Sequence, residues 1–341
     1  MASFEPPATF KAVAVTKLGV FEIIEKQWRD PEPGEIAVKV LACGICRSDD
    51  WIRTQIFPTG FPRVPGHEII GDCVAVHPSE KAWKVGDRVG SGWHGGQCNA
   101  CDRCRVGDVV TCPSENVNGI SQDGGWAEYV ILNTEGIARI PKDIDPAEAA
   151  PLLCAGVTTY NGLRHMDTKA GDIAAVQGIG GLGHLAIQYC HAMGFQTVAL
   201  STGPSKKELA KSLGAYAYLD SSTVNQTEEL LKMGGADLLV LTAPYPEAMA
   251  NLIMGVKPGG TILILALAAE NLALPIAAVV AQKLSIRGWK VGSPKDCEDT
   301  IHFSQLAGVK AHVQKFSLED AVKAFNGMMD GSVKFRAVIV P

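Results

Sequence analysis

The stretch IAAVQGIGGLG at residues 173–183 decides the fold of this chain. The apolar run that ends at Gly178 predicts a buried strand, and the residues that follow have helical spacing up to Gly194. Between a strand and a helix, a G-x-G-x-x-G turn lets the backbone approach a pyrophosphate and places the phosphates at the positive end of the helix. We therefore interpret this turn as a dinucleotide-binding site, with an ordinary flexible turn as the alternative. Its residues are Gly178, Gly180, Gly181, Leu182 and Gly183.

The sequence around this turn alternates between strand-like and helix-like segments. From about residue 155 to 285, short apolar runs that suit strands buried on both faces are separated by helical stretches. This alternation predicts a parallel, doubly wound sheet of the Rossmann type. The expected strands are 173–178, 197–200, 217–219, 236–243, 261–268 and 284–290, and the expected helices are 181–193 and 205–213.

The first 150 residues have a different pattern. They contain short strand-like runs broken by Gly and Pro, such as 35–41, 69–76 and 126–132, which predicts a mostly antiparallel, barrel-like domain. The last segment carries a helix at 318–329 and a strand at 336–340, and we expect it to return to this domain. The sequence thus predicts an α/β protein with two domains, one formed by 1–154 and 286–341 and the other by 155–285.

The composition is that of an ordinary globular protein. Of 341 residues, 47% are hydrophobic and 20% are charged. A net charge of −5 without a basic run argues against nucleic-acid or membrane partners. The most apolar stretch, 261–269, is too short to span a bilayer. Because the chain opens with MASFEPPATF rather than a charged and apolar leader, we expect a cytoplasmic, reducing location.

Four cysteines are spaced C-x2-C-x2-C-x7-C in a glycine-containing lobe at 95–113. Four thiolates separated by short, turn-forming spacers suit one tetrahedral Zn²⁺. Two local disulfides are the alternative, which a reducing compartment disfavours. A closed Cys₄ site leaves no open coordination position, so this zinc is expected to hold structure rather than to do chemistry. The ligands are Cys98, Cys101, Cys104 and Cys112.

A second candidate metal site consists of Cys46, His67 and Cys154. Taken singly, each would by default be a buried cysteine or a core histidine. However, Asp49 is placed to orient the imidazole, and Glu68 lies beside the histidine in sequence. Three protein ligands leave the fourth position of zinc for water or substrate, which is the catalytic arrangement.

These motifs together resemble the zinc-dependent alcohol dehydrogenases of the medium-chain dehydrogenase/reductase superfamily over nearly the full length. The matching motifs are GICRSD at 44–49, GHE at 66–68, the four-cysteine lobe, the region from Cys154 to Thr158, and GIGGLG at 178–183. The resemblance implies a GroES-like catalytic domain, a Rossmann domain, and two zincs per chain, the catalytic one on Cys46, His67 and Cys154. It also implies that Ser48 shuttles the alcohol proton and that Arg47 and Arg336 lie near the pyrophosphate. Beside these, we take Asp49 and Glu68 as further candidate catalytic residues and Thr158 as a further candidate for cofactor binding.

The end of the expected second strand indicates which nucleotide binds. An acid at this point would accept hydrogen bonds from a ribose 2′-hydroxyl and repel a 2′-phosphate. Here no acid occurs from Ser201 to Lys207; Ser201, Thr202 and Lys206 are instead suited to a phosphate dianion. A solvated loop whose lysines touch nothing is the alternative. This stretch is also similar to that of the NADPH-preferring aldehyde reductases, so we expect NADP(H) rather than NAD(H).

The resemblance also bears on substrate and assembly. Because polyol dehydrogenases tend to carry glutamate at the position of Cys154, the chain is more similar to the alcohol and cinnamyl-alcohol branches, and we expect an alcohol dehydrogenase that acts mainly as an aldehyde reductase. An NAD-dependent alcohol or polyol dehydrogenase, and a relative that binds zinc and nucleotide without catalysis, are the alternatives. Trp51, Phe57 and Trp93 fall where the family lines its substrate pocket, which favours apolar or aromatic alcohols and aldehydes; core packing is the alternative. Many relatives have a proton-relaying histidine at the position of Trp51, and tryptophan cannot take that role. We expect a homodimer or homotetramer that pairs through the edge strand at 284–290.

Overall fold

The computed structural model describes residues 4–341, which divide into two compact units. The barrel unit comprises the chain up to Val157 together with Val291–Ser304 and Lys310–Pro341. The parallel-sheet unit comprises Thr158–Lys290 and Gln305–Val309. The first boundary, after Val157, falls inside the helix α4 (Ala155–Arg164), and the second, after Lys290, comes before the helix α10 (Pro294–Ala307). The short piece Gln305–Val309, which begins inside α10, was not expected from the sequence.

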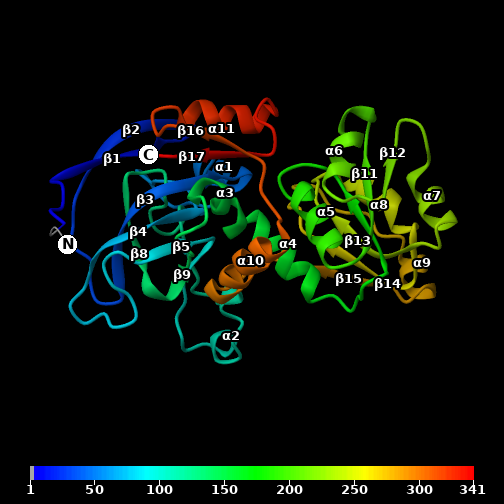
Figure 1. Cartoon of the computed structure of the whole chain (residues 1–341), viewed down its shortest axis with the longest axis horizontal. Helices are drawn as coiled ribbons and strands as arrows, with labels where there is room; N and C mark the ends of the chain where they lie inside the picture. Colours follow the sequence, from blue (N-terminus) through cyan, green and yellow to red (C-terminus); the bar gives the residue numbers. More distant parts are fainter. Residues whose placement is uncertain (1–3) are drawn as a thin grey trace. The chain divides into compact units, whose positions relative to one another are not determined.

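The parallel-sheet unit contains the expected Rossmann-type sheet, drawn in green to yellow in Figure 1. All neighbouring strands run parallel. In spatial order they are β12 (Ala217–Asp220), β11 (Gln196–Ser201), β10 (Ile173–Gln177), β13 (Ala236–Leu241), β14 (Val256–Ile264) and β15 (Ser285–Gly288). The chain builds outward from β10 to β12 and then returns to β13 beside β10. The strand order therefore reverses between β10 and β13, and such sheets bind nucleotides at the carboxyl ends of the strands at this point.

Helices connect these strands. They are α5 (Gly183–Ala192), α6 (Lys207–Ser212), α7 (Gln226–Lys232), α8 (Pro246–Ile253) and α9 (Ile276–Ala281), with the short 3-10 turn η5 (Pro204–Lys206) before α6. In such a sheet helices cover both faces, so the central strands are buried and apolar. Ala174, Val176 and Leu239, for example, are fully buried.

The barrel unit is built on a largely antiparallel sheet, as expected. In spatial order its strands are β16 (Val313–Phe316), β17 (Arg336–Ile339), β3 (Glu35–Ile45), β4 (Ile69–Val76), β5 (Arg88–Ser91) and β9 (Ala138–Arg139), and β8 (Tyr129–Asn133) also pairs with β3. Only β16 and β17 pair in parallel among these strands of residues 4–341. Strand β17 pairs with β3, so the last segment returns to this unit, where Figure 1 draws it in red.

Smaller elements complete the barrel unit. The strands are β1 (Thr9–Lys17), β2 (Val20–Gln27), β6 (His94–Gly96) and β7 (Asn116–Val117). The helices are α1 (Asp50–Arg53), α2 (Asp102–Arg105), α3 (Pro146–Ala149) and α11 (Ala321–Asp330), and the 3-10 turns are η1 (Arg47–Asp49), η2 (Val109–Thr111), η3 (Thr134–Gly136) and η4 (Ala150–Leu153). In the core, the fully buried Trp126 packs its ring 5.4 Å from that of Phe21 and 6.1 Å from that of Phe325.

Several expected boundaries were wrong, each for a local reason. Strand β14 begins at Val256, earlier than predicted, because Val256 already pairs with Ala236; after an irregularity in the register, the pairing resumes at Thr261 opposite Leu238. It ends at Ile264 because the N–H groups of Leu265 and Ala266 both turn toward the carbonyl of Leu241. Strand β8 begins only at Tyr129, since the N–H of Trp126 donates to Pro65 instead of joining the ladder.

In the part of the chain that the structure describes, no helix combines the length and the apolar character that crossing a membrane requires.

Candidate active site and metal centres

Sheet geometry brings the first candidate metal ligands together. Cys46 directly follows β3, and His67 comes just before β4. Strands β3 and β4 are antiparallel, with Cys43 opposite Ile69, so the end of one meets the start of the other at the same edge of the sheet. Cys154 follows the turn η4 and reaches the same place.

The donor atoms of this cluster have the spacing of a metal site. The Sγ atoms of Cys46 and Cys154 are 3.9 Å apart, and the ligand atoms of Cys46, His67, Glu68 and Cys154 all lie within 4.8 Å of one another. With Zn–S bonds of about 2.3 Å, two sulfurs of a tetrahedral site are separated by about 3.8 Å. A disulfide, with an S–S bond of about 2.05 Å, is excluded by the same distance. Two thiolates and an imidazole are ligands that suit Zn²⁺.

Asp49 fixes the orientation of the histidine. Its carboxylate accepts the N–H of Cys46 at 2.8 Å and that of Gly66 at 3.3 Å, and its Oδ1 lies 3.3 Å from Nδ1 of His67. Both side chains are fully buried. Burial is the strongest single effect and would lower the pKa of His67, but the charges and polar contacts of Asp49 and Cys46 together raise it well above its usual value. The 3.3 Å contact does not have hydrogen-bond geometry, but a carboxylate beside Nδ1 favours a proton on that nitrogen and leaves Nε2 for a metal.

Ser48 belongs to the 3-10 turn η1, which places its side chain beside the cluster. Its Oγ is 3.1 Å from Sγ of Cys46 and 3.4 Å from Nε2 of His67. Because a hydroxyl can both donate and accept, it can pass a proton at the position where an oxygen ligand of a metal would stand. The neighbouring Arg47 is exposed, so its guanidinium does not join the buried cluster.

Glu68 and Arg336 form a buried ion pair within the barrel unit. The resemblance implied a place for Arg336 near the pyrophosphate; in the barrel unit its guanidinium contacts Glu68. Burial raises the pKa of Glu68, while the positive charge of Arg336 opposes that rise. Glu68 Oε2 has no hydrogen-bond partner within residues 4–341, and a carboxylate oxygen of Glu68 is among the grouped donor atoms. The residue is therefore a neighbour of the metal cluster rather than a remote structural acid.

The pKa values of the two thiols in the cluster are shifted in opposite directions. The hydrogen bond from Cys154 lowers the pKa of Cys46, with further help from His67, whereas the same hydrogen bond and burial raise the pKa of Cys154. Two thiolates this close repel each other unless a cation neutralises them. This arrangement fits a divalent metal bound by both sulfurs.

The three aromatic residues predicted for a substrate pocket form one continuous wall. Trp93 packs edge to face on His67 with ring centroids 5.1 Å apart, and Trp51 packs on Trp93 at 6.0 Å. Phe57 lies 5.5 Å from Trp51 and is 42% exposed, so the wall runs from the buried histidine to the surface. The outer end of this aromatic wall, Trp93–Trp51–Phe57, is therefore open to solvent.

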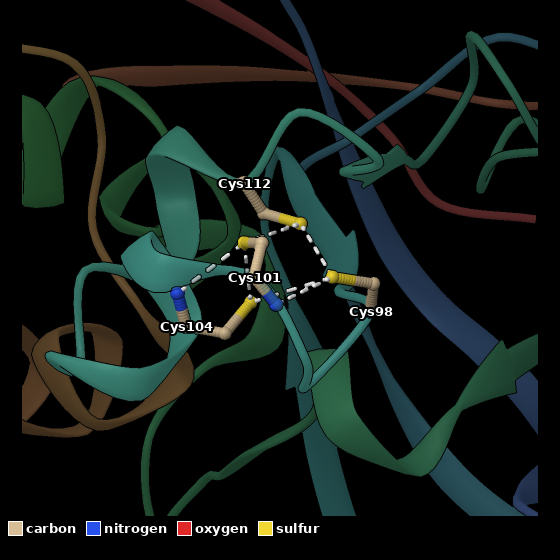
Figure 2. A group of neighbouring side chains, drawn as sticks. All are labelled: Cys98, Cys101, Cys104 and Cys112. Atoms are coloured by element: carbon tan, nitrogen blue, oxygen red, sulfur yellow. Dashed lines mark hydrogen bonds between the residues drawn. The ribbon is translucent and has the colours of Figure 1, made fainter.

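The four-cysteine lobe brings its thiols around a common centre, as Figure 2 shows. Successive Sγ distances are 3.6 Å for Cys112–Cys98, 3.5 Å for Cys101–Cys104, 3.9 Å for Cys101–Cys112 and 4.0 Å for Cys98–Cys104. These values bracket the sulfur separation of about 3.8 Å expected around tetrahedral zinc. All ten cysteines of the chain lie in the described residues, and none of them forms a disulfide.

Backbone N–H groups stabilise the thiolate form of part of this lobe, which is the form that binds a cation. The N–H groups of Ala100 and Cys101 lower the pKa of Cys98 to about 6, and the N–H of Cys104 points at Sγ of Cys101 at 3.5 Å. Desolvation and the hydrogen bond from Cys101 raise the pKa of Cys104 to about 12. Without a cation the four thiols therefore do not all ionise at neutral pH. The buried His94, beside the lobe, pairs with Glu115 and Gln97 and is not a metal ligand.

The glycine-rich turn has the geometry that phosphate binding requires. Gly178 has a φ of +88°, and a Cβ on Gly183 would stand 1.9 Å from the carbonyl oxygen of Gly178, so both positions need glycine. A Cβ on Gly180 would meet nothing within 4 Å, which leaves its backbone open to a ligand. Helix α5 starts at this turn, and the side chain of its N-cap residue, Leu182, makes no capping hydrogen bond. A phosphate can take that capping role.

The residues predicted to choose the nucleotide follow β11 in the same unit. Ser201 ends the strand, and Thr202 and Lys206 are exposed after it. The ammonium group of Lys206 donates to the carbonyl of Ile179 at 3.0 Å, so this lysine spans from the β11 loop to the glycine-rich turn. The side chain therefore touches a defined partner, contrary to the alternative of a free solvated lysine. Thr158 is buried at the start of the unit.

Sequence reasoning missed some residues of these sites. The pairing of Glu68 with Arg336 joins positions 268 residues apart, and nothing in the local sequence announces it. Asp220, at the end of β12, accepts a hydrogen bond from the loop after Ser201. Its position at a strand end would have been the only available signal.

Comparisons with known proteins agree with this architecture. Residues 32–142 match the alcohol dehydrogenase GroES-like domain, and residues 181–305 match the zinc-binding dehydrogenase family. The alcohol dehydrogenase patD of Penicillium expansum is 44% identical over 334 residues, covering 98% of this chain and 98% of that protein. An alcohol dehydrogenase of Geobacillus stearothermophilus is 36% identical over 326 residues, covering 93% of this chain and 95% of that one. The solved structure of a cinnamyl alcohol dehydrogenase from Sorghum bicolor has a TM-score of 0.87 at 27% identity, covering 97% of each chain. The chain therefore belongs to the zinc-dependent alcohol dehydrogenases of the medium-chain dehydrogenase/reductase superfamily.

Proposed function

We propose that this alcohol dehydrogenase uses a catalytic zinc held by Cys46, His67 and Cys154 to interconvert primary alcohols and aldehydes with NADP(H). The observation that carries the proposal is the convergence of two sulfurs and an oriented imidazole beside the Ser48 hydroxyl. A second zinc in the four-cysteine lobe would have a structural role, because that donor set leaves no position for substrate.

The residues of the cluster divide the chemistry between them. Zinc would supply a Lewis acid; it lowers the pKa of bound water from about 15.7 to about 7, which at about 1.36 kcal/mol per unit corresponds to ~12 kcal/mol. A positioned acid or base such as Ser48 typically raises the reaction rate about 10²–10⁴-fold, so its contribution is smaller than that of the zinc. Aldehyde reduction needs a proton at oxygen, which Ser48 is placed to deliver, and a hydride at carbon, which NADPH would carry. Asp49 keeps the imidazole of His67 in the orientation that binds metal.

The proton has no exit through residue 51. Trp51 packs on Phe57 and Trp93, and an indole cannot accept a proton at neutral pH. The path from Ser48 must therefore continue through water or the nucleotide ribose. The same aromatic wall favours apolar or aromatic substrates of medium size, because planar groups can stack or pack edge to face against it.

The preference for NADP(H) rests on the end of β11. Ser201 and Thr202 offer hydroxyl donors, and Lys206 keeps two of its three N–H donors for a phosphate after bonding to Ile179. We expect NADPH to give a higher kcat/KM than NADH. Ser201→Asp should lower the ratio of the two kcat/KM values about 10-fold or more, since a carboxylate there repels the phosphate dianion and accepts from a ribose hydroxyl. Steady-state kinetics over aromatic and aliphatic aldehydes measure this ratio.

Ser205→Asp is the matched control for that experiment. It adds the same charge to the same exposed loop but away from the strand end, so the ratio should change far less. If the unaltered protein already turns over faster with NADH, the assignment of NADP(H) is wrong.

We also propose that two copies associate through β15. This strand is at the edge of the sheet formed by the described strands, and the helix before it exposes Ile276 (64%) and Val280 (72%) on one face. Unpaired strand edges and exposed apolar rows favour pairing with a second chain. The ten free cysteines suit a reducing compartment such as the cytoplasm.

The association can be tested by light scattering. The wild-type protein should have the mass of a dimer or tetramer, and the double variant Ile276→Lys/Val280→Lys should lower that mass because it places two charges in the contact. Leu231→Lys, which alters an exposed apolar residue on α7, should leave the mass unchanged. A wild-type protein that is monomeric at micromolar concentration would rule the contact out.

A further inference from the structure

The loop that follows β11 is held by the segment that follows β12. The carbonyl of Ser201 accepts the N–H of Ser221 at 3.0 Å and the side-chain amide of Gln226 at 3.0 Å. The hydroxyls of Thr202 and Ser221 are 2.8 Å apart. These contacts fix the backbone that carries the proposed nucleotide-selecting hydroxyls.

Asp220 makes the charged contact in this set. It lies directly opposite Ser201 in the parallel register of β11 and β12. Its Oδ1 accepts the N–H of Gly203 at 2.7 Å and, from Ser222, the N–H at 2.9 Å and the hydroxyl at 2.7 Å. The hydroxyl of Tyr218 donates to the carbonyl of Gly203 at 2.5 Å, so both the N–H and the C=O of Gly203 are held.

The conformation of Gly203 explains why such a clamp is needed. Its φ of +76° lies in the left-handed region, and a Cβ there would meet nothing within 4 Å. Glycine is therefore free to adopt several conformations at this point, and tertiary contacts must select one. A hydrogen bond to an ionised acceptor is about twice as strong as a neutral one. The hydrogen bonds from Ser222 lower the pKa of Asp220, which keeps the acceptor ionised.

We infer that Asp220 is a positioning residue for nucleotide discrimination, which clamps the N–H of Gly203 and thereby sets the loop that presents Ser201, Thr202 and Lys206 to the ribose 2′ position. The inference rests on the proposed use of NADP(H). The far end of the loop is anchored separately, because Lys206 is bonded to Ile179 in the glycine-rich turn. Loss of the clamp should therefore disturb contacts at the 2′ position more than contacts to the pyrophosphate.

The carboxylate has a second possible effect of opposite sign. A negative charge near the 2′ position would repel the phosphate of NADPH, so removing it would strengthen NADPH binding. Two substitutions separate these effects. Asp220→Asn keeps an oxygen acceptor for Gly203 but removes the charge, whereas Asp220→Ala removes both.

The test is the binding of NADPH and of NADH to the full-length protein, followed by nucleotide fluorescence, with the discrimination ratio defined as Kd for NADH divided by Kd for NADPH. Asp220→Ala should lower this ratio about 10-fold, because a phosphate dianion loses several geometry-dependent bonds while a 2′-hydroxyl loses little. Asp220→Asn should keep the ratio at or above that of the wild type. Glu208→Ala removes an exposed carboxylate of the next helix and should leave it unchanged.

Three results would overturn the inference: an unchanged ratio in Asp220→Ala, a rise in that variant, or an equal fall in Asp220→Asn. The side chain of Asp220 is at the partly exposed end of β12, so the variants should fold, and their melting temperatures should confirm that. A wild-type protein that binds NADH more tightly contradicts the proposed NADP(H) preference. It leaves the role of Asp220 testable, because each variant is compared with the wild-type ratio.

Discussion

Replacing Cys46 with serine should abolish turnover while leaving the protein folded. A serine hydroxyl is a poor zinc ligand compared with a thiolate, and its neighbour Cys154 cannot hold the ion with His67 alone. We expect kcat for aldehyde reduction to fall about 10⁴-fold or more, since the Lewis acid contributes more than any proton-relaying group. Metal analysis should find one zinc per chain instead of two.

Cys73→Ala is the matched control for this prediction. Cys73 is also a buried cysteine, but it lies in the hydrophobic core of the barrel unit, its thiol donates to the carbonyl of Ala75, and it is outside both metal clusters. This variant should keep two zincs and a near-normal kcat. Full activity in Cys46→Ser with two zincs retained would disprove the ligand assignment.

Cys101→Ser should have the second large effect, on stability rather than on chemistry. Cys101 contacts the sulfurs of both Cys104 and Cys112, so its loss opens the tetrahedron of the lobe. Apparent binding free energies of structural zinc in small domains are about 10–16 kcal/mol, which is comparable with the whole free energy of unfolding of a domain. We expect the melting temperature to fall by about 10 °C or more, or the protein to fail to accumulate in folded form.

Thermal unfolding monitored by circular dichroism, together with zinc content, checks this prediction. Cys73→Ala again serves as the control for loss of a buried thiol. A melting temperature of Cys101→Ser within about 2 °C of wild type would show that the lobe does not depend on metal.

The fold was largely predictable because its strongest patterns are local. Two of these patterns are the continuous apolar runs at 173–178 and 236–243, and the structure contains the corresponding strands β10 and β13. A third is the glycine-rich turn between a strand and a helix, which is typical of nucleotide-binding sheets. The helices α7, α8 and α9 were not assigned from sequence, because they are short and their patterns are weak. Strand β16 was also missed. It has only four residues, and its pairing with β17 stabilises it more than any pattern in its own sequence.

The candidate site was predictable to the extent that its residues carry motifs. The spacing of the four cysteines and the GHE motif at 66–68 pointed to clusters that the structure forms. Contacts between segments far apart in the chain could not be recognised from local sequence patterns. Neither the ion pair of Glu68 with Arg336 nor the clamp of Asp220 on Gly203 follows from local sequence, because strand order and register create both.

Anomalous diffraction at the zinc edge from crystals of the wild-type protein tests the central claim most directly. We predict a peak at bonding distance, about 2.0–2.3 Å, from Sγ of Cys46, Nε2 of His67 and Sγ of Cys154, in addition to one among the four cysteines of the lobe. A peak in the lobe with none among those three side chains would contradict the proposed catalytic zinc.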